Sequence, residues 1–176
     1  MTTLPAQLSY QSNDAANPET LYPAALRDIA NLDRAASAYA DIRTWPGYEP
    51  SPLLRLDEPL SFWGGVDPGS GVITQPRHPQ HGHSVAGTVL AMPRGIGSSS
   101  SSAVLLELLH LGRAPRALLM GEVDAILALG VVVAREMGFA TVAVVECDVT
   151  RLPGGVVRVA RDGTVVAVGP GDDETN

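Results

Sequence analysis

Short hydrophobic runs separated by glycine-containing turns fill the chain from Leu60 to about residue 170, and this alternation constrains the fold more than any other feature. The expected strands are 85–92, 116–120, 141–146, 156–159 and 164–168, and the expected helices are 103–111 and 131–137. The last two strands form a hairpin around the Asp162-Gly163 turn. Because only two helices are expected, the pattern favours a compact α/β domain over a doubly wound sheet.

The first 57 residues have a different texture and are expected to form an N-terminal arm. Residues 1–20 are polar and are predicted to be a mobile tail, as are residues 171–176 at the other end. Within 21–57, apolar positions at helical spacing predict one amphipathic helix, namely Ala24, Ala25, Ile29, Leu32, Ala36 and Tyr39. Prolines at 46, 50 and 52 then impose an extended path. We expect the arm to dock on the domain, on a partner or on a second copy, through Trp45, Tyr48 and Leu53.

Charge narrows the classes of partner. The net charge is −7, and the 12 basic residues are all arginine. An acidic chain of this kind is not expected to bind nucleic acid or to use a polybasic membrane anchor. The absence of lysine excludes Schiff-base chemistry within this chain. The N-terminus has no signal-peptide pattern and no apolar run is long enough to cross a membrane, so we expect a cytoplasmic protein.

Residues that could bind a metal are few. Cys147 is the single cysteine, which excludes an internal disulfide and a zinc or iron–sulfur ligand set within the chain. We interpret Cys147 as a small core residue. His78, His81 and His83 lie close together, which indicates either a metal site or a solvated loop. Without a pattern of carboxylates or cysteines nearby, the loop is favoured and no metal site is predicted. Asp124, close to Glu122, is expected to cap a helix.

A glycine–serine segment is the strongest candidate for chemistry. Arg94-Gly95-Ile96-Gly97 follows a predicted strand, and five serines, Ser98 to Ser102, lead into a predicted helix. Glycines at such a junction let the backbone approach a ligand, and the N–H groups of the helix start attract an anion. A serine placed there could exchange a proton with that ligand. A flexible serine linker with a helix cap explains the same residues, and the pattern alone does not separate the two interpretations.

A second segment, Ser61-Phe62-Trp63-Gly64-Gly65-Val66-Asp67-Pro68, is by itself typical of a strand end and a turn. In combination the segments are distinctive: LSFWGGVDPGSGVI, RHPQHG, VAGTVLAMPRGIGSSSSSAVLLELL, APRALLM and DAILALGVVVAREMG follow one another in the order and spacing of one family. Over residues 58–170 the chain resembles the small, swivelling domain of aconitase X-type dehydratases. The resemblance implies a compact swivelling β/β/α domain, to which the N-terminal helical and extended arm is added.

The resemblance also implies a function. Family members are lyases that remove water from a small carboxylate substrate, cis-3-hydroxy-L-proline in bacteria or 5-phosphomevalonate in archaea. A large partner subunit carries an iron–sulfur cluster or metal, so no cofactor is expected in this chain. The small domain closes over the substrate, and by itself it is expected to be inactive. In the family, the serine after the second glycine of the loop is the proton-abstracting base, and the corresponding residue here is Ser98. We expect Ser98 to face a solvent-accessible pocket. Substrate-binding positions by the same resemblance are Gly64, Gly65, Asp67, Arg94, Gly95, Gly97 and Ser99.

One departure from the family pattern leaves alternatives open. Family loops commonly place a cation between the two glycines, where this chain has Ile96. Without that charge, either altered substrate specificity or loss of activity is expected. Arg94, two residues earlier, could supply a positive charge, but its side chain should leave the strand in a different direction. A composition rich in alanine, valine and arginine favours a bacterial source, and hence hydroxyproline over phosphomevalonate. The other class of function is a stand-alone, non-catalytic swivel domain that binds a ligand, or a second copy of itself through the arm.

Overall fold

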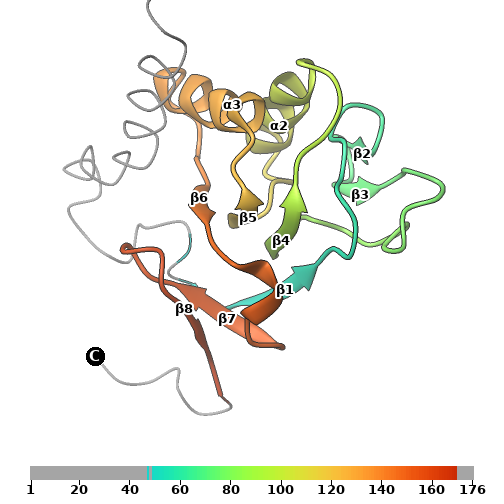
Figure 1. Cartoon of the computed structure of the whole chain (residues 1–176). Coiled ribbons are helices and arrows are strands. Elements are labelled where there is room, and N and C mark those ends of the chain that lie inside the picture. Colours follow the sequence, from blue (N-terminus) through green and yellow to red (C-terminus); the bar gives the residue numbers. More distant parts are fainter. Residues whose placement is uncertain (1–46, 48, 170–176) are drawn as a thin grey trace, which may run out of the picture.

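The computed structural model describes residue 47 and residues 49–169 of the 176-residue chain. Six strands form one mixed sheet in the order β6-β5-β4-β1-β7-β8, and β2 and β3 form a separate hairpin (Figure 1). The strands are β1 Ser51–Arg55, β2 Val66–Asp67, β3 Val72–Ile73, β4 Val89–Arg94, β5 Ala117–Glu122, β6 Ala143–Glu146, β7 Val156–Val159 and β8 Val165–Ala167. The helices are α2 Ser101–His110 and α3 Ala125–Glu136, and the 3-10 turn is η3 Val149–Arg151. The predicted α/β class is confirmed.

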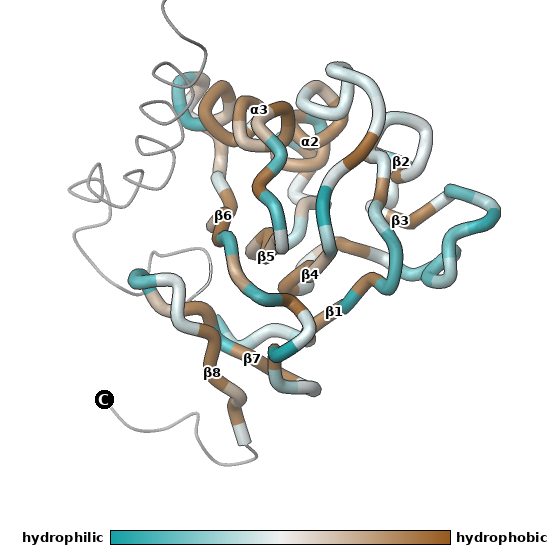
Figure 2. Tube along the Cα trace, in the orientation of Figure 1, coloured by the Kyte–Doolittle hydropathy of each residue, from teal (hydrophilic) through white to brown (hydrophobic). Residues whose placement is uncertain are grey.

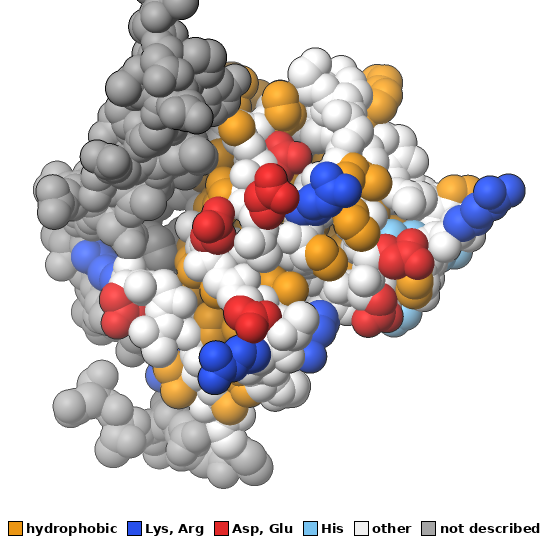
Figure 3. Space-filling view, viewed as in Figure 1, with side chains coloured by type: hydrophobic (Ala, Val, Ile, Leu, Met, Phe, Trp, Pro, Cys, Tyr) orange, Lys and Arg blue, Asp and Glu red, His pale blue; other side chains and the backbone are white. Residues whose placement is uncertain are grey.

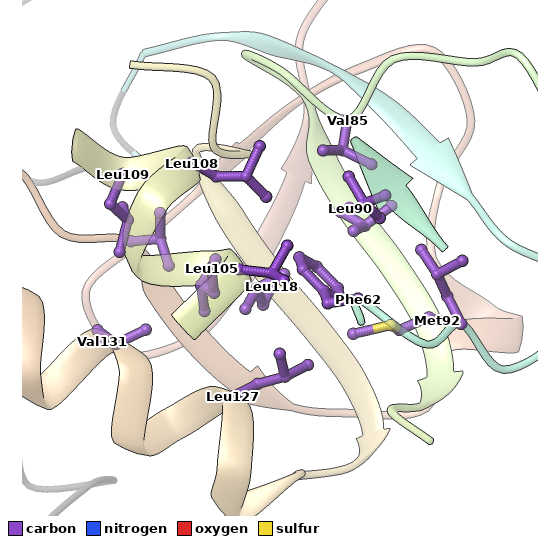
Figure 4. Packing of buried hydrophobic residues seen from close by; sticks show 14 of the residues in the cluster. Phe62, Val85, Leu90, Met92, Leu105, Leu108, Leu109, Leu118, Leu127 and Val131 are labelled. Atoms are coloured by element: carbon purple, nitrogen blue, oxygen red, sulfur yellow. The ribbon is translucent and has the colours of Figure 1, made fainter. Parts of the chain in front are cut away.

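Both α-helices cover one face of the sheet. β1, β4, β5 and β6 run parallel, and α2 and α3 are the crossovers that follow β4 and β5. Alternate strand residues point toward the helices, and Figure 4 shows Leu90, Met92 and Leu118 in one cluster with Leu105 and Leu127. The central strands are hydrophobic along most of their length (Figure 2), because their other face is buried as well.

The sheet curls until its two ends approach each other. Val89 and Leu119, which point away from the helices, form a second core cluster with Val157 of β7. β6 and β8 are the two edge strands of this sheet. At the tip of the β7–β8 hairpin, a Cβ built on Gly163 would lie 3.2 Å from the Val145 side chain of β6. The sheet is therefore a half-barrel whose concave side is filled by the second cluster.

The structure corrects the predicted domain start at residue 58. β1 lies in the middle of the sheet, parallel to β4 and antiparallel to β7, although its residues had been assigned to the arm. Prolines impose the extended backbone that a strand also needs, so the same pattern suits both structures. Leu53, an expected docking anchor, packs instead against the second core cluster. Trp45, Tyr48, the predicted N-terminal helix and both predicted tails lie outside the described residues.

The ends of both helices have local causes. α3 begins well before its predicted start, because the Asp124 carboxylate accepts hydrogen bonds from the backbone N–H groups of Ile126 and Leu127, at 2.7 and 3.1 Å. The predicted capping role of Asp124 is thus confirmed. Gly112 and Gly138, expected to close the helices, follow α2 and α3 at positive φ. Within the described part of the chain, neither helix has the length and apolar character needed to cross a membrane.

Candidate functional site

The carboxyl ends of β4, β5 and β6 meet at one edge of the sheet, which is where ligands of open α/β sheets commonly bind. The strand register places Arg94 beside Glu122, and Met120 beside Glu146. Two short connections leave this edge: residues 95–100 lead into α2, and the second, after Glu122, leads into α3. The predicted glycine–serine segment is therefore a strand-to-helix loop at the carboxyl edge, called the serine loop below.

Ser98 is exposed at the centre of the serine loop. Gly97 precedes it at φ 101°, a conformation that a residue with a side chain rarely adopts. The Ser98 Oγ accepts a hydrogen bond from the Ser100 N–H at 3.2 Å, and the Ser98 carbonyl accepts one from the Ser101 N–H at 2.9 Å. An N–H donor on the hydroxyl oxygen and the nearby positive end of α2 both stabilise negative charge. These contacts suit Ser98 to carry negative charge at an accessible position.

The predicted aromatic–glycine segment begins in contact with the serine loop. Leu60 forms a β-bridge with Gly95, and the Leu60 carbonyl accepts a hydrogen bond from the Ile96 N–H at 3.2 Å. Residues 62–65 form a bend and a turn where the end of a strand was expected. The reason is Phe62, whose side chain is completely buried in the core beneath the helices (Figure 4). This burial anchors the turn beside the loop.

Two further contacts hold the turn against the serine loop and the start of α2. The Trp63 N–H donates a hydrogen bond to the Ser101 Oγ at 3.2 Å. A Cβ built on Gly97 would lie 2.5 Å from the Ser61 Oγ and 3.2 Å from the Ser61 Cβ, so the two segments approach closely and a side chain at 97 would displace Ser61. The structure therefore brings together two segments that are more than thirty residues apart in the sequence.

Asp124, the cap of α3, lies against the serine loop as well. A Cβ built on Gly95 would lie 2.5 Å from the Asp124 Oδ2. Both glycines of the loop thus occupy positions where a side chain would collide with a neighbour, which gives the Gly-x-Gly spacing a steric cause. The other carboxylate oxygen of Asp124 accepts two backbone N–H groups, which offsets its negative charge near the loop.

The residues around Ser98 present mixed chemistry to solvent. Trp63 is 58% exposed and Ile96 is 36% exposed, which is high for large hydrophobic side chains. Ser99 is exposed next to Ser98, and Arg94 is exposed at the end of β4. Arg94 makes no ion pair within the described residues. A ligand or partner protein that approaches the loop would thus meet hydroxyl groups, a cation and two apolar side chains.

Gly64, Gly65 and Asp67, predicted to bind substrate, have clear roles in the backbone of this region. Gly64 has φ 72°, and a Cβ on Gly65 would collide with the Ser61 carbonyl oxygen. The Asp67 carboxylate accepts hydrogen bonds from the Ser70 hydroxyl and from two backbone N–H groups of the β2–β3 turn. The Ser70 hydrogen bond is the main cause that holds the pKa of Asp67 below its ordinary value. The DPGSG segment is therefore a tight turn, as predicted.

The histidine loop is held by hydrogen bonds to its own backbone. His78 is buried, its Nδ1 accepts from the Gln80 N–H at 3.1 Å, and its Nε2 lies 3.3 Å from the Glu58 carbonyl. His81 and His83 are exposed and each contacts a backbone carbonyl of the same loop. No three His, Cys, Asp or Glu side chains gather in a metal-binding arrangement within residues 49–169. The solvated-loop interpretation fits His81 and His83, whereas His78 is a buried structural residue.

A shallow groove of about 560 Å³ lies near the same carboxyl edge. It is lined by Pro93, Gly121, Glu146, Cys147, Asp148, Val149 and Thr150. Ser98 is not among these residues, so this groove is not the pocket that was expected to face Ser98. Burial, and to a lesser extent the charge of Asp148, raises the pKa of the Cys147 thiol, and Cys147 packs against the second core cluster. These observations agree with its interpretation as a small core residue.

Sequence reasoning missed three contacts at this edge: Ser61 and Asp124 lie against the serine loop, and the Ser101 hydroxyl accepts the Trp63 N–H. Asp124 could have been found, because a cap residue after β5 must lie at the same edge as the loop after β4. The Ser101 contact depends on Phe62 being buried, which folds the following residue back onto α2. No local pattern indicates that contact.

These observations define the class of domain: an α/β half-barrel with a glycine–serine loop at the start of its first described helix. A family model described as the aconitase X swivel domain matches residues 41–168. The chain therefore belongs to the aconitase X swivel-domain family.

Individual relatives cover different shares of the chain. Aconitase X of Thermococcus kodakaraensis, solved in its holo form, matches with a TM-score of 0.59 and 34% identity over 66% of this chain and 86% of that chain. The phosphomevalonate dehydratase small subunit of Thermococcus onnurineus is 42% identical over 117 residues, which are 66% of this chain and 86% of that protein. The cis-3-hydroxy-L-proline dehydratase of Pseudomonas aeruginosa is 52% identical over 85 residues, but the match spans only 15% of its length.

Proposed function

We propose that this chain is the small subunit of an aconitase X-type dehydratase, a cytoplasmic hydro-lyase that a separate large subunit completes. The chain matches 86% of a protein named as a small subunit, and it matches a minor part of a larger dehydratase. A chain that corresponds to one part of such an enzyme is expected to be inactive alone. Its partner is accordingly the large subunit, with the substrate bound between the two proteins.

The position of Ser98 is the observation that carries this proposal. Ser98 is exposed at the carboxyl edge of the parallel strands, directly after Gly97 and three residues before α2 begins at Ser101. Its Oγ receives the Ser100 N–H, so the oxygen is already oriented by one donor before any ligand arrives. A serine linker without function would not require two glycines packed against Ser61 and Asp124. We therefore assign Ser98 as the proton-abstracting base.

The proposed step is a 1,2-elimination of water. The deprotonated Ser98 Oγ takes a proton from the carbon next to the substrate carboxylate. The electron pair of that C–H bond forms a carbon–carbon double bond. The hydroxyl group leaves the adjacent carbon with the electron pair of its C–O bond and takes up a proton to become water. Ser98 then releases the proton that it took, which regenerates the base. The Ser100 N–H and the α2 terminus offset the negative charge of the alkoxide, while groups of the large subunit must supply the rest of its stabilisation.

Substrate-binding roles follow from the surroundings of Ser98. Arg94 is a cation without an ion pair among the described residues, and it is proposed to bind the substrate carboxylate. Gly95 and Gly97 allow close approach of the backbone, and the Ser99 hydroxyl is available as a donor. The turn that carries Gly64, Gly65 and Asp67 borders the loop and is proposed to close over the substrate. This closure would place all seven positions around one small molecule.

The iron–sulfur cluster or metal of the enzyme belongs to the large subunit in this proposal. The described residues of this chain do not fit such a group: Cys147 is the single cysteine of the sequence, and no three potential ligands gather within residues 49–169. Cys147 is also half-buried and packed against the second core cluster.

The proposed substrate is cis-3-hydroxy-L-proline, with 5-phosphomevalonate as the alternative. A phosphate group carries close to two negative charges and is commonly bound by several cations or N–H donors. The serine loop offers Arg94 but has the apolar Ile96 between its glycines. A small substrate with one carboxylate matches this surface better than a substrate that adds a phosphate. The 52% identity to the Pseudomonas aeruginosa enzyme supports the same choice.

Co-expression with a candidate large subunit tests the proposal. The complex is purified through a tag on this chain and assayed for dehydration of both substrates, in the native form and as Ser98→Ala. Ser84→Ala is the matched control, because Ser84 is also an exposed serine but lies next to β3, outside the serine loop. We expect turnover of hydroxyproline that is lost in Ser98→Ala and kept in Ser84→Ala. Equal turnover in all three forms would contradict the assignment of the base.

A non-catalytic swivel domain is the second candidate, and Ile96 is the observation that favours it. A loop without the family's cation could bind a small anion through Arg94 without completing the reaction. In that case the chain would purify without a partner, and isothermal titration with small carboxylates would detect binding in the absence of turnover.

A further inference from the structure

The outer face of α3 carries an apolar stripe. Leu129 and Met137 are 51% and 55% exposed, and Ile126 and Val133 are half-buried. Steps of three, four and four residues separate these four positions, so they lie along one side of the helix. We call them the α3 stripe. Figure 3 shows hydrophobic side chains at the surface over α3.

The α3 stripe is not needed to bury α3 in its own domain. The side of α3 that packs on the core uses other residues, namely Leu127, Ala128, Gly130, Val131 and Ala134. A helix that is apolar on its outer side as well is expected to have a second partner.

The described chain begins on the side of the molecule where α3 leads into the sheet. The Gly47 carbonyl accepts a hydrogen bond from the Val159 N–H at 2.9 Å. Val159 ends β7, and the tip of the β7–β8 hairpin approaches Val145 of β6 through Gly163. β6 is the edge strand that follows α3. The residues before Gly47 therefore emerge near the strand into which α3 runs.

The preceding segment has the apolar pattern of a helix suited to pack on the α3 stripe. The family match begins at residue 41, so residues 1–40 lie outside the matched domain. Within them, Ile29, Leu32, Ala36 and Tyr39 recur at helical spacing. Residues 40–46 can span at most about 23–25 Å between such a helix and Gly47.

We propose that residues 24–39 of this chain form an amphipathic helix that packs on the α3 stripe. Its apolar positions would lie against Leu129, Val133 and Met137, and its charged residues would face solvent. The proposal gives residues 24–39 a binding surface on their own domain. It is independent of the catalytic role proposed for Ser98.

Cross-linking in the full chain tests this contact. With Cys147→Ser as background, Leu32→Cys is combined with Leu129→Cys and treated with a short bismaleimide. Val166→Cys is the matched control, because Val166 on β8 is also 51% exposed. We expect an intramolecular cross-link between 32 and 129 and none between 32 and 166. A cross-link found only between two chains would overturn the proposal in favour of a second copy, and no cross-link would overturn it altogether.

Hydrogen exchange gives a second readout that does not depend on engineered cysteines. We expect residues 24–39 to be protected in the isolated full chain at all concentrations. Leu129→Glu should speed their exchange by about tenfold or more, because it removes an apolar contact, whereas Val166→Glu should leave it unchanged. Unprotected residues 24–39 in the native chain, or protection that appears only after addition of the large subunit, would contradict the proposal.

Discussion

The Trp63 N–H donates a hydrogen bond to the Ser101 hydroxyl at 3.2 Å, across 38 residues of sequence. This bond joins the turn that follows Phe62 to the first residue of α2. Ser101 is only 4% exposed, so water cannot easily replace its hydroxyl as the acceptor. The relative position of the aromatic–glycine turn and the serine loop therefore depends on this contact.

The first prediction concerns Ser101→Ala. The substitution leaves the Trp63 N–H without its acceptor, and we expect the free energy of unfolding to fall by about 1–3 kcal/mol. Urea denaturation followed by circular dichroism measures the change. Ser100→Ala is the control, since the side chain of Ser100 makes no capping hydrogen bond and should change stability little. An equal loss in both variants would show that the Trp63 contact is not what the hydroxyl provides.

The second prediction concerns Gly97→Ala. An alanine at φ 101° strains the backbone by about 1–3 kcal/mol, and its Cβ would also press on the Ser61 Oγ. We expect loss of stability together with loss of turnover in the complex, because the strain moves Ser98.

Gly82→Ala separates the two effects expected for Gly97→Ala, namely backbone strain and the contact of the new Cβ with Ser61. Gly82 also has positive φ, at 83°, but a Cβ there would meet nothing within 4 Å. It should lose stability by backbone strain alone and keep its activity. If Gly97→Ala and Gly82→Ala lose the same stability in urea titrations and keep the same turnover in the assay, the close approach of Gly97 to Ser61 is not needed for activity.

The parts of the fold that follow local rules could be predicted from the sequence. The β7–β8 hairpin forms around Asp162-Gly163 as expected, because the turn residues determine it. The β1 strand was assigned to the arm, because its place in the sheet depends on pairing with β4 and β7, which no local pattern records. The core position of Phe62 was missed for a similar reason.

The candidate site was predictable in one respect and not in another. The position of the serine loop between a strand and a helix follows from its sequence. Its contacts with Ser61 and Asp124, and the nearby Trp63–Ser101 hydrogen bond, arise from strand order and curvature, which bring distant segments together. The roles of individual residues at the substrate stay predictions.

The third prediction concerns acid stability. Hydrogen bonds within turns, chiefly from Ser70, Thr150 and Thr164, lower the pKa of Asp67, Asp148 and Asp162 in the folded protein. A carboxyl whose folded pKa is depressed contributes stability above its unfolded pKa, and the contribution is lost as pH falls through the folded value. We expect the urea midpoint to fall with decreasing pH below about 4.

Replacement of all three aspartates by asparagine tests that cause. Asparagine keeps an acceptor oxygen but has no proton to bind, so the variant should lose part of the pH dependence below about 4. An unchanged pH profile in the triple variant would assign the acid sensitivity to other carboxyl groups.

The last prediction concerns Ile96, which is 36% exposed between the two glycines of the serine loop. Ile96→Arg would add a cation next to Ser98, at the place where the resembling family loops commonly have one. Since a phosphate gains more from a second cation than a single carboxylate does, kcat/KM for 5-phosphomevalonate should rise relative to that for cis-3-hydroxy-L-proline, by about tenfold if one charge-assisted hydrogen bond forms. Ile96→Gln, which adds a polar side chain without charge, is the matched control. A similar shift in both variants would assign the effect to polarity, and a fall in activity on both substrates would mean that the apolar side chain itself positions the loop.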